Sequence, residues 1–187
     1  MNLRYLVVSS AAAAIFAGAV SAASARTFIL ADSACTYPDV TATDVTADKK
    51  LGDALDAHDS TKTAYWGEIH LREQLNEVQS VPSAHCRALN YASVLNSGSE
   101  IVFELIAASE DAKALKYARK LAQIWQRYHR DPGVLADSDA KASYEGFPDE
   151  ITHALHYQCE PAAPDGKCPW PVPASIAKST MQQLLAQ

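Results

Sequence analysis

Apolar side chains recur at every third or fourth position along most of this chain, the spacing that places them on one face of an α-helix. The pattern is clearest over residues 109–130, which open with Ser109 and two acidic side chains and close with His129 and Arg130. Acidic residues favour the first turn of a helix and basic residues its last, and the Pro-Gly pair that follows stops it. We therefore expect a long amphipathic helix over this segment.

Shorter helical patterns lie on both sides of this segment. Thr46 is the expected N-cap of the first of them. Gly98 is the expected stop of a helix that begins at Ser83, and Ser97 to Glu100 match a capping box in front of a short apolar helix. The last helix is expected to bury Ile176. The predicted helices cover about 46–57, 62–79, 83–96, 101–108, 148–158 and 174–186.

The helix predicted over 62–79 has two distinct faces. Glu68 and Arg72 are spaced to form an ion pair across one turn. By the same helical spacing, His70, Glu73 and Glu77 lie away from the apolar side and are expected at the surface. The residues expected to face the core are Ala64, Leu71, Leu75 and Val78.

The remaining segments show no regular period. Residues 26–43 are expected to be extended, and residues 133–147 to form a polar loop. No stretch alternates between apolar and polar residues as a half-buried strand does. We therefore predict that residues 26–187 form a single all-α domain, a disulfide-stabilised bundle of about six or seven helices.

The first 25 residues have the features of a cleaved secretory signal peptide. Arg4 provides the positive charge, Tyr5 to Val20 form an apolar stretch, and small residues follow up to Ala25. Cleavage is expected after Ala25 or Ala22, and an uncleaved N-terminal anchor is the alternative. No later segment is apolar over the roughly 20 residues that a membrane span requires. We expect a periplasmic or secreted protein with no transmembrane segment in its mature chain.

Four cysteines in an exported chain indicate two disulfides. Three pairings are possible. We favour Cys159–Cys168, because the prolines and the glycine between them suit a loop that folds back, and this choice leaves Cys35–Cys86. A metal site or a redox pair is the alternative, but the chain lacks the C-x-x-C spacing that those functions commonly use.

Composition narrows the class of protein. The chain has 16 basic and 22 acidic side chains and a formal net charge of −6. This balance excludes a globally basic nucleic-acid-binding protein. Its apolar content of 48% is too high for a disordered tail. No nucleic-acid partner and no cofactor are expected.

One helix departs from this acidic balance. In the segment 109–130, a step of 100° per residue places the apolar side chains, from Leu115 to Tyr128, on one half of the helix. The other half holds no acidic residue. Such a stripe attracts an anionic ligand, an anionic lipid head group or an acidic protein surface. Its six basic residues are Lys113, Lys116, Arg119, Lys120, Arg127 and Arg130.

Internal compensation is the alternative to a binding role for this stripe. The segment from Asp44 to Asp59 carries five aspartates and could pack alongside the basic residues. The stripe would then be neutralised within the protein itself.

A metal site is a weaker candidate. Glu150 and His153 have the i,i+3 spacing of carboxylate-bridged metal sites in helical bundles, and His156 follows. Such a site needs further ligands, for which Glu100 and Glu104 are helical candidates. The two histidines lie opposite the apolar side of their helix, so a surface cluster is favoured over a metal centre in the core.

Catalytic motifs do not point to an enzyme class. The chain has no G-x-S-x-G, no H-E-x-x-H and no glycine-rich phosphate loop. Trp170 lies among prolines outside any predicted helix. It is either an exposed anchor at a binding face or a plug beside a disulfide.

These observations favour a binding or inhibitory protein over an enzyme. We predict that it recognises an anionic or acidic partner, either a protein or a ligand, through the basic helix face, with Trp170 as a further contact. A small all-α enzyme with an inter-helix pocket and a periplasmic metal-binding protein that uses Glu150, His153 and His156 remain as alternatives.

Overall fold

The computed structural model describes residues 35, 38–156 and 172–186. Over these residues the chain forms seven helices and no strand, which confirms the predicted all-α bundle. None of the described helices combines the length and the apolarity that a membrane span requires. The helices are α2 Ala42–Asp56, α3 Ser60–Ser80, α4 Ala84–Ala107, α5 Asp111–Tyr128, α6 Pro132–Ala136, α7 Ser138–Leu155 and α8 Ala174–Leu185.

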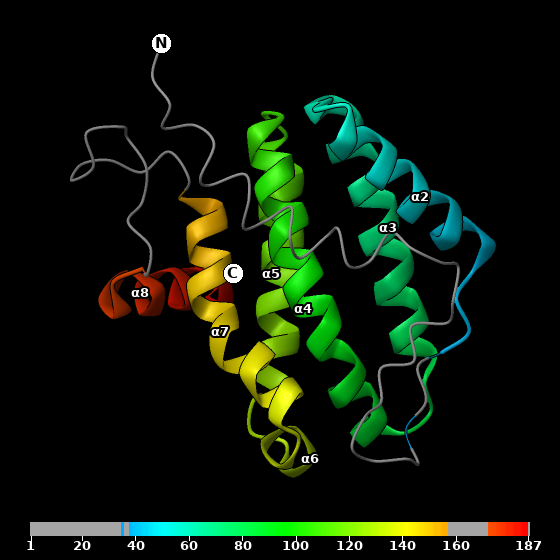
Figure 1. Cartoon of the computed structure of the whole chain (residues 1–187). Helices are drawn as coiled ribbons and strands as arrows, with labels where there is room; N and C mark the ends of the chain where they lie inside the picture. Colours follow the sequence, from blue (N-terminus) through cyan, green and yellow to red (C-terminus); the bar gives the residue numbers. More distant parts are fainter. Residues whose placement is uncertain (1–34, 36–37, 157–171, 187) are drawn as a thin grey trace.

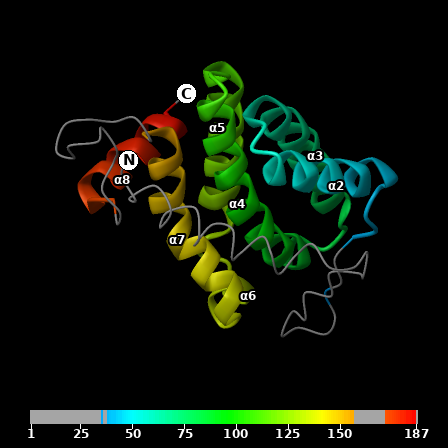
Figure 2. The ribbon, with the colours of Figure 1, turned by 45° about the horizontal axis from the view of Figure 1, so that its top comes forward.

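Helix α4 lies at the centre of the bundle and packs against α3, α5 and α7. Helix α2 lies along α3 at one edge of the molecule, and α8 packs against α7 and α5 at the other (Figures 1 and 2). The core fills the space between α4 and its three neighbours. Its largest fully buried side chains are Leu71, Leu75, Val78, Val94, Leu95, Val102, Leu105, Leu121, Val134, Tyr144, Phe147 and Ile151.

Helix α4 continues through the position where the sequence predicts a stop, so the prediction of two separate helices is wrong. A Cβ atom on Gly98 would lie 2.7 Å from Cδ1 of the buried Leu121. The glycine therefore allows α5 to approach α4 closely. The Ser97 hydroxyl, expected to cap a new helix, lies 3.1 Å from the carbonyl oxygen of Ser93 and 2.9 Å from Oε1 of Gln74. It is thus satisfied within a continuous helix.

The segment predicted as a polar loop is also helical. Helix α6 and the first ten residues of α7 occupy it, and the Asp137 side chain caps α7 by accepting from the backbone N–H groups of Asp139 and Ala140. Tyr144, Phe147 and Ile151 are spaced by three and four residues and are all buried. This apolar stripe crosses Pro148, where the sequence predicts the start of a helix.

Pro148 lies inside α7. Because proline has no backbone N–H, the carbonyl of Tyr144 four residues earlier loses its helical donor. Trp125 of α5 donates its indole N–H to this carbonyl at 2.8 Å. A side chain from another helix therefore replaces the missing bond, and α7 continues.

Two smaller predictions also need correction. Helix α2 is capped by Thr41, and Thr46 lies inside the helix with its hydroxyl donating to the carbonyl of Ala42 at 2.8 Å. In α8, Ile176 is 43% exposed. The residues of α8 that face the core are Ala177, Thr180, Met181 and Leu184.

The contact between α2 and α3 is polar, and it buries residues that were expected at the surface. His70 and Glu77 are each 5% exposed. The Asp44 carboxylate lies 2.5 Å from Nδ1 of His70, and Oε1 of Glu77 accepts from the backbone N–H of Thr41 at 2.7 Å. Burial raises the pKa of Glu77, and the charge of Asp44 adds to this effect. Docking of α2 turns a polar stripe of α3 into an interior one.

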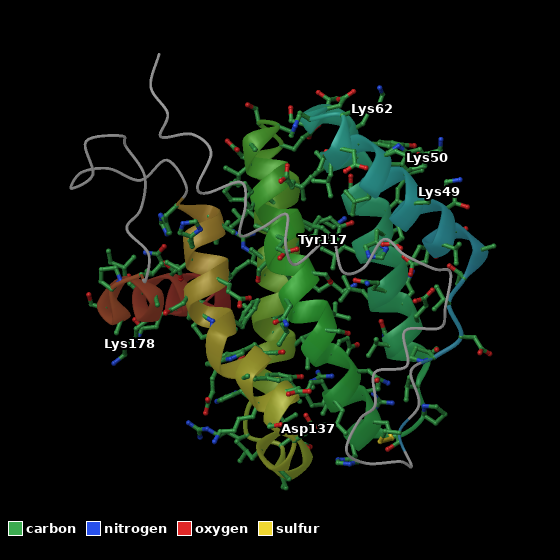
Figure 3. All side chains as sticks on the ribbon, viewed as in Figure 1. Lys49, Lys50, Lys62, Tyr117, Asp137 and Lys178 are labelled. Atoms are coloured by element: carbon green, nitrogen blue, oxygen red, sulfur yellow. A yellow bond between two sulfur atoms is a disulfide. The ribbon has the colours of Figure 1, made fainter. Side chains whose placement is uncertain are left out.

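The predicted Cys35–Cys86 disulfide is present in the structure. It ties the segment before α2 to the first turn of α4, near the lower end of α4 in Figure 3. The predicted pair Cys159–Cys168 lies outside the described residues.

Candidate functional site

A pocket of about 540 Å³ lies where α3, α4 and α5 meet at one end of the bundle. It is formed by the last turn of α3, the first two turns of α4 and the second half of α5. The end of α3 and the start of α4 lie side by side near the bottom of Figure 1. The lining residues are Gln79, Arg87, Tyr91, Lys120, Gln123, Ile124, Arg127 and Tyr128.

Helical spacing explains why these side chains share one pocket. Arg87 and Tyr91 are four residues apart on α4, so they lie on the same face. On α5 the lining positions recur after three, four, seven and eight residues from Lys120, which is one continuous strip of the helix surface. The turn at Pro82 reverses the chain and brings the end of α3 beside the start of α4.

Two contacts fix the wall that α4 contributes. Nη1 of Arg87 donates to the backbone carbonyls of Val81 and Pro82, at 2.5 and 2.9 Å. Tyr91 stacks against Tyr128 of α5, with ring centroids 5.7 Å apart and ring planes 28° apart. The Cys35–Cys86 disulfide holds the residue just before Arg87. The guanidinium and the aromatic wall are thus held in place by backbone, ring and covalent contacts.

The pocket is positively charged. Arg87, Lys120 and Arg127 line it, and none of its described lining residues is acidic. Burial raises the pKa of Tyr91, and the charges of Arg87 and Arg127 act in the opposite direction, so both guanidinium groups lie close to this phenol. Burial and the neighbouring charge of Lys116 lower the pKa of Lys120. The pocket therefore gathers three cationic side chains from α4 and α5.

The structure brings part of the predicted basic stripe into this pocket and leaves the rest outside. Lys120 and Arg127 line the pocket. At the other end of α5, Lys113 forms ion pairs with Glu68 at 3.2 Å and Glu110 at 3.6 Å. These pairs replace the predicted Glu68–Arg72 pair, because Arg72 lies 3.3 Å from the neighbouring Glu73.

The other three basic residues differ in their surroundings. The Lys116 ammonium lies over the ring of Tyr117, 5.2 Å from its centroid. Arg119 is half-buried, and Arg130 is exposed beyond the end of α5. Leu115, which was placed on the apolar half, is 38% exposed. The buried half of the helix is centred on the side of Leu121 and lies opposite the basic residues.

The acidic segment does not neutralise the pocket. Helix α2 packs against α3 at the outer edge of the molecule (Figures 1 and 2). Two aspartates of the acidic segment have other partners: Asp44 lies against His70, and Asp59, just beyond α2, pairs with Lys62 at 2.8 Å. Within the described ranges, no carboxylate lies within ion-pair distance of Lys120 or Arg127.

The candidate metal ligands are only partly brought together. Burial raises the pKa of Glu100 to about 7, and the charges of Glu150 and Glu104 add to this effect, so carboxyl groups of α4 and α7 lie near each other. Nε2 of His156 lies 3.1 Å from Oγ1 of Thr180 on α8, so this histidine faces a neighbouring helix. Burial lowers the pKa of His153. In the described part of the chain, no three such side chains are arranged to hold a metal ion.

The walls that α3 and α4 contribute to the pocket were not predicted from the sequence. Arg87 and Tyr91 share a face of a predicted helix, and this i,i+4 pair was the available signal. Nothing in the sequence indicated that this face meets α5, because that contact joins residues far apart in the chain. Trp170, the remaining predicted contact, lies outside the described residues.

Comparison with family models, with curated proteins and with solved structures finds no match for this chain.

Proposed function

We propose that this chain is an exported, all-helical binding protein that recognises an anionic partner through the basic face of α5. In this proposal the pocket between α3, α4 and α5 receives the negative group. One observation carries it: Arg87, Lys120 and Arg127, from two helices, line a single pocket with no described acidic residue, in a chain with net charge −6.

Physical chemistry favours an anion as the occupant. Arginine offers several N–H donors in a plane that matches the oxygen atoms of a carboxylate or a phosphate. Lys120 adds a third positive charge, and the acidic surface elsewhere repels anions from the rest of the molecule. An anion in the pocket would be attracted by all three cations at once.

The same lining favours binding over catalysis. None of its described residues is a carboxylate or a histidine, the side chains that most often act as general bases. Burial raises the pKa of Tyr91, which keeps this phenol protonated and able to donate a hydrogen bond. The Cys35–Cys86 disulfide supports the exported location, because disulfides persist mainly in oxidising compartments.

The test is an NMR titration of the oxidised mature protein, residues 26–187, with inorganic phosphate at low and at high salt. We expect shifts of the Arg87, Lys120 and Arg127 signals that weaken at high salt. The double variant K120Q/R127Q is expected to lose affinity roughly tenfold or more.

A matched control removes the same charge elsewhere. Lys49 and Lys50 are exposed on α2, on the outer edge of the molecule in Figure 3. The variant K49Q/K50Q should bind phosphate like the unmodified protein. Equal losses in both double variants would show that only net charge matters and would overturn the proposal, as would the absence of any phosphate-induced shift.

A further inference from the structure

The pocket has apolar as well as cationic walls. Ile124 of α5 is half-buried and faces the pocket, and the rings of Tyr91 and Tyr128 stack beside it. Inorganic phosphate and sulfate gain no affinity from contact with apolar surfaces, because their oxygen atoms bind water and N–H groups. An apolar wall next to three cations suits a molecule that carries a charged and an apolar part.

The volume of the pocket also favours a ligand that carries a charged and an apolar part. Its volume of about 540 Å³ lies within the range of roughly 300–1,000 Å³ that is typical of sites for organic ligands. A single inorganic oxyanion at the cations would leave much of this space to water. An organic group attached to the oxyanion would displace that water from Ile124 and from the tyrosine rings.

The side chains of the lining favour a flat group. Guanidinium groups are planar and stack on aromatic rings, and two of them line this pocket beside two phenol rings. The Arg87 guanidinium is held by the carbonyls of Val81 and Pro82. An aromatic ring that enters the pocket would therefore meet planar surfaces that are already ordered.

We propose that the pocket takes a small aromatic oxyanion, an aryl phosphate or aryl carboxylate. The oxyanion binds at Arg87, Lys120 and Arg127, and the ring packs against Ile124 and the stacked tyrosines. This inference rests on the proposed function, because it specifies the ligand class of the same site. Gln79 and Gln123 supply amide groups that can hydrogen-bond to polar substituents of the ring or to the oxyanion.

The experiment compares three probes on the oxidised protein by calorimetry or NMR: phenyl phosphate, inorganic phosphate and the neutral benzyl alcohol. We expect phenyl phosphate to bind roughly tenfold tighter than inorganic phosphate, because its ring is removed from water. Benzyl alcohol should bind much more weakly than phenyl phosphate. This comparison uses the unmodified protein and does not depend on any variant.

Two variants test where the aromatic ring and the oxyanion of the ligand bind. I124A should bring the affinity for phenyl phosphate close to that for inorganic phosphate and leave the latter unchanged, with I124V in between. R127Q should weaken both phosphates by a similar factor. Circular dichroism and thermal melts establish that each variant is folded, and I124V removes only one methyl group from a half-buried side chain.

The outcomes separate this inference from the proposed function. If inorganic phosphate binds in the pocket and phenyl phosphate binds no tighter, the aromatic ligand class is wrong and anion binding stands. If benzyl alcohol binds as tightly as phenyl phosphate, the cations play no part and both proposals are wrong. If no probe binds, both are wrong as well.

Discussion

The two ends of α4 carry side chains of opposite charge, and the two groups of side chains differ in their access to water. At the N-terminal end, Arg87 joins Lys120 and Arg127 in a pocket open to water. Beyond its middle, Glu100 and Glu104 lie half-buried, and Glu100 is close enough to Glu150 of α7 to be affected by its charge. Both regions gather like charges on neighbouring helices.

The difference lies in the access of water. The Lys120 and Arg127 side chains are exposed, so they can exchange water for an anion. The glutamates are packed between helices, and Glu100 responds by holding its proton up to about pH 7. Exposed clustered cations can exchange their water for a ligand, whereas the buried Glu100 makes the stability of the fold depend on pH.

Removal of the disulfide should have the largest effect, and mainly at the pocket end. Cys35 and Cys86 are 51 residues apart, and a cross-link of this span stabilises a fold by about 4 kcal/mol in the chain-entropy model. We expect C35A/C86A to lose about this much free energy of unfolding in urea titrations. Hydrogen exchange should rise more around residues 84–91 than around Glu100.

A second double variant serves as the control. C159A/C168A removes the other predicted pair, whose shorter loop implies a smaller loss. An unchanged unfolding free energy in C35A/C86A would mean that the pocket end of α4 is not anchored covalently.

Replacement of Glu100 should produce the next largest effect. Because its pKa in the fold is about 7 and its ordinary value is 4.5, the folded state binds the proton more tightly. Stability therefore falls as the pH rises from about 4.5 to about 7 and stays lower above that range. E100Q should gain roughly 1–3 kcal/mol at pH 8 and almost nothing at pH 4.

Urea titrations across this pH range measure the effect, with E145Q on α7 as the matched control. Glu145 is exposed, so its replacement should leave the pH profile unchanged. A gain for E100Q that is the same at both pH values would contradict the link to its ionisation.

Neutralisation of the pocket should have a small effect on stability. Because Lys120 and Arg127 are solvated and have no described acidic partner, K120Q/R127Q should change the free energy of unfolding by less than about 0.5 kcal/mol. The same variant is expected to lose anion affinity. A large destabilisation would instead show that these two side chains contribute to the packing of α5.

The smallest expected effect concerns a single pKa. Burial and then the charge of Lys116 lower the pKa of Lys120. K116Q should therefore raise the pKa of Lys120 and leave the fold intact, as followed by NMR of the lysine side-chain signals. K113Q, further along α5 and paired with Glu68, provides the comparison. No change at Lys120 would mean that burial alone sets its pKa.

Local patterns predicted most of the fold, and the errors have identifiable causes. The bounds of α3, α5 and α8 follow from periodicity and end signals, which are properties of neighbouring residues. Gly98 and Pro148 were read as helix boundaries from their intrinsic preferences. In the fold, close packing against Leu121 and the indole N–H of Trp125 override those preferences.

The sequence by itself determined that the chain is helical and that one face of α5 is basic, because both depend on the order of residues within one segment. It also indicated the Cys35–Cys86 pair. Only the tertiary structure decided which cations share a pocket and that Arg87 and two tyrosines also line it. It also decided that α2 packs against α3 and not against the basic residues of α5. These contacts join distant parts of the chain, and the free energy that selects them comes from packing α4 against its neighbours.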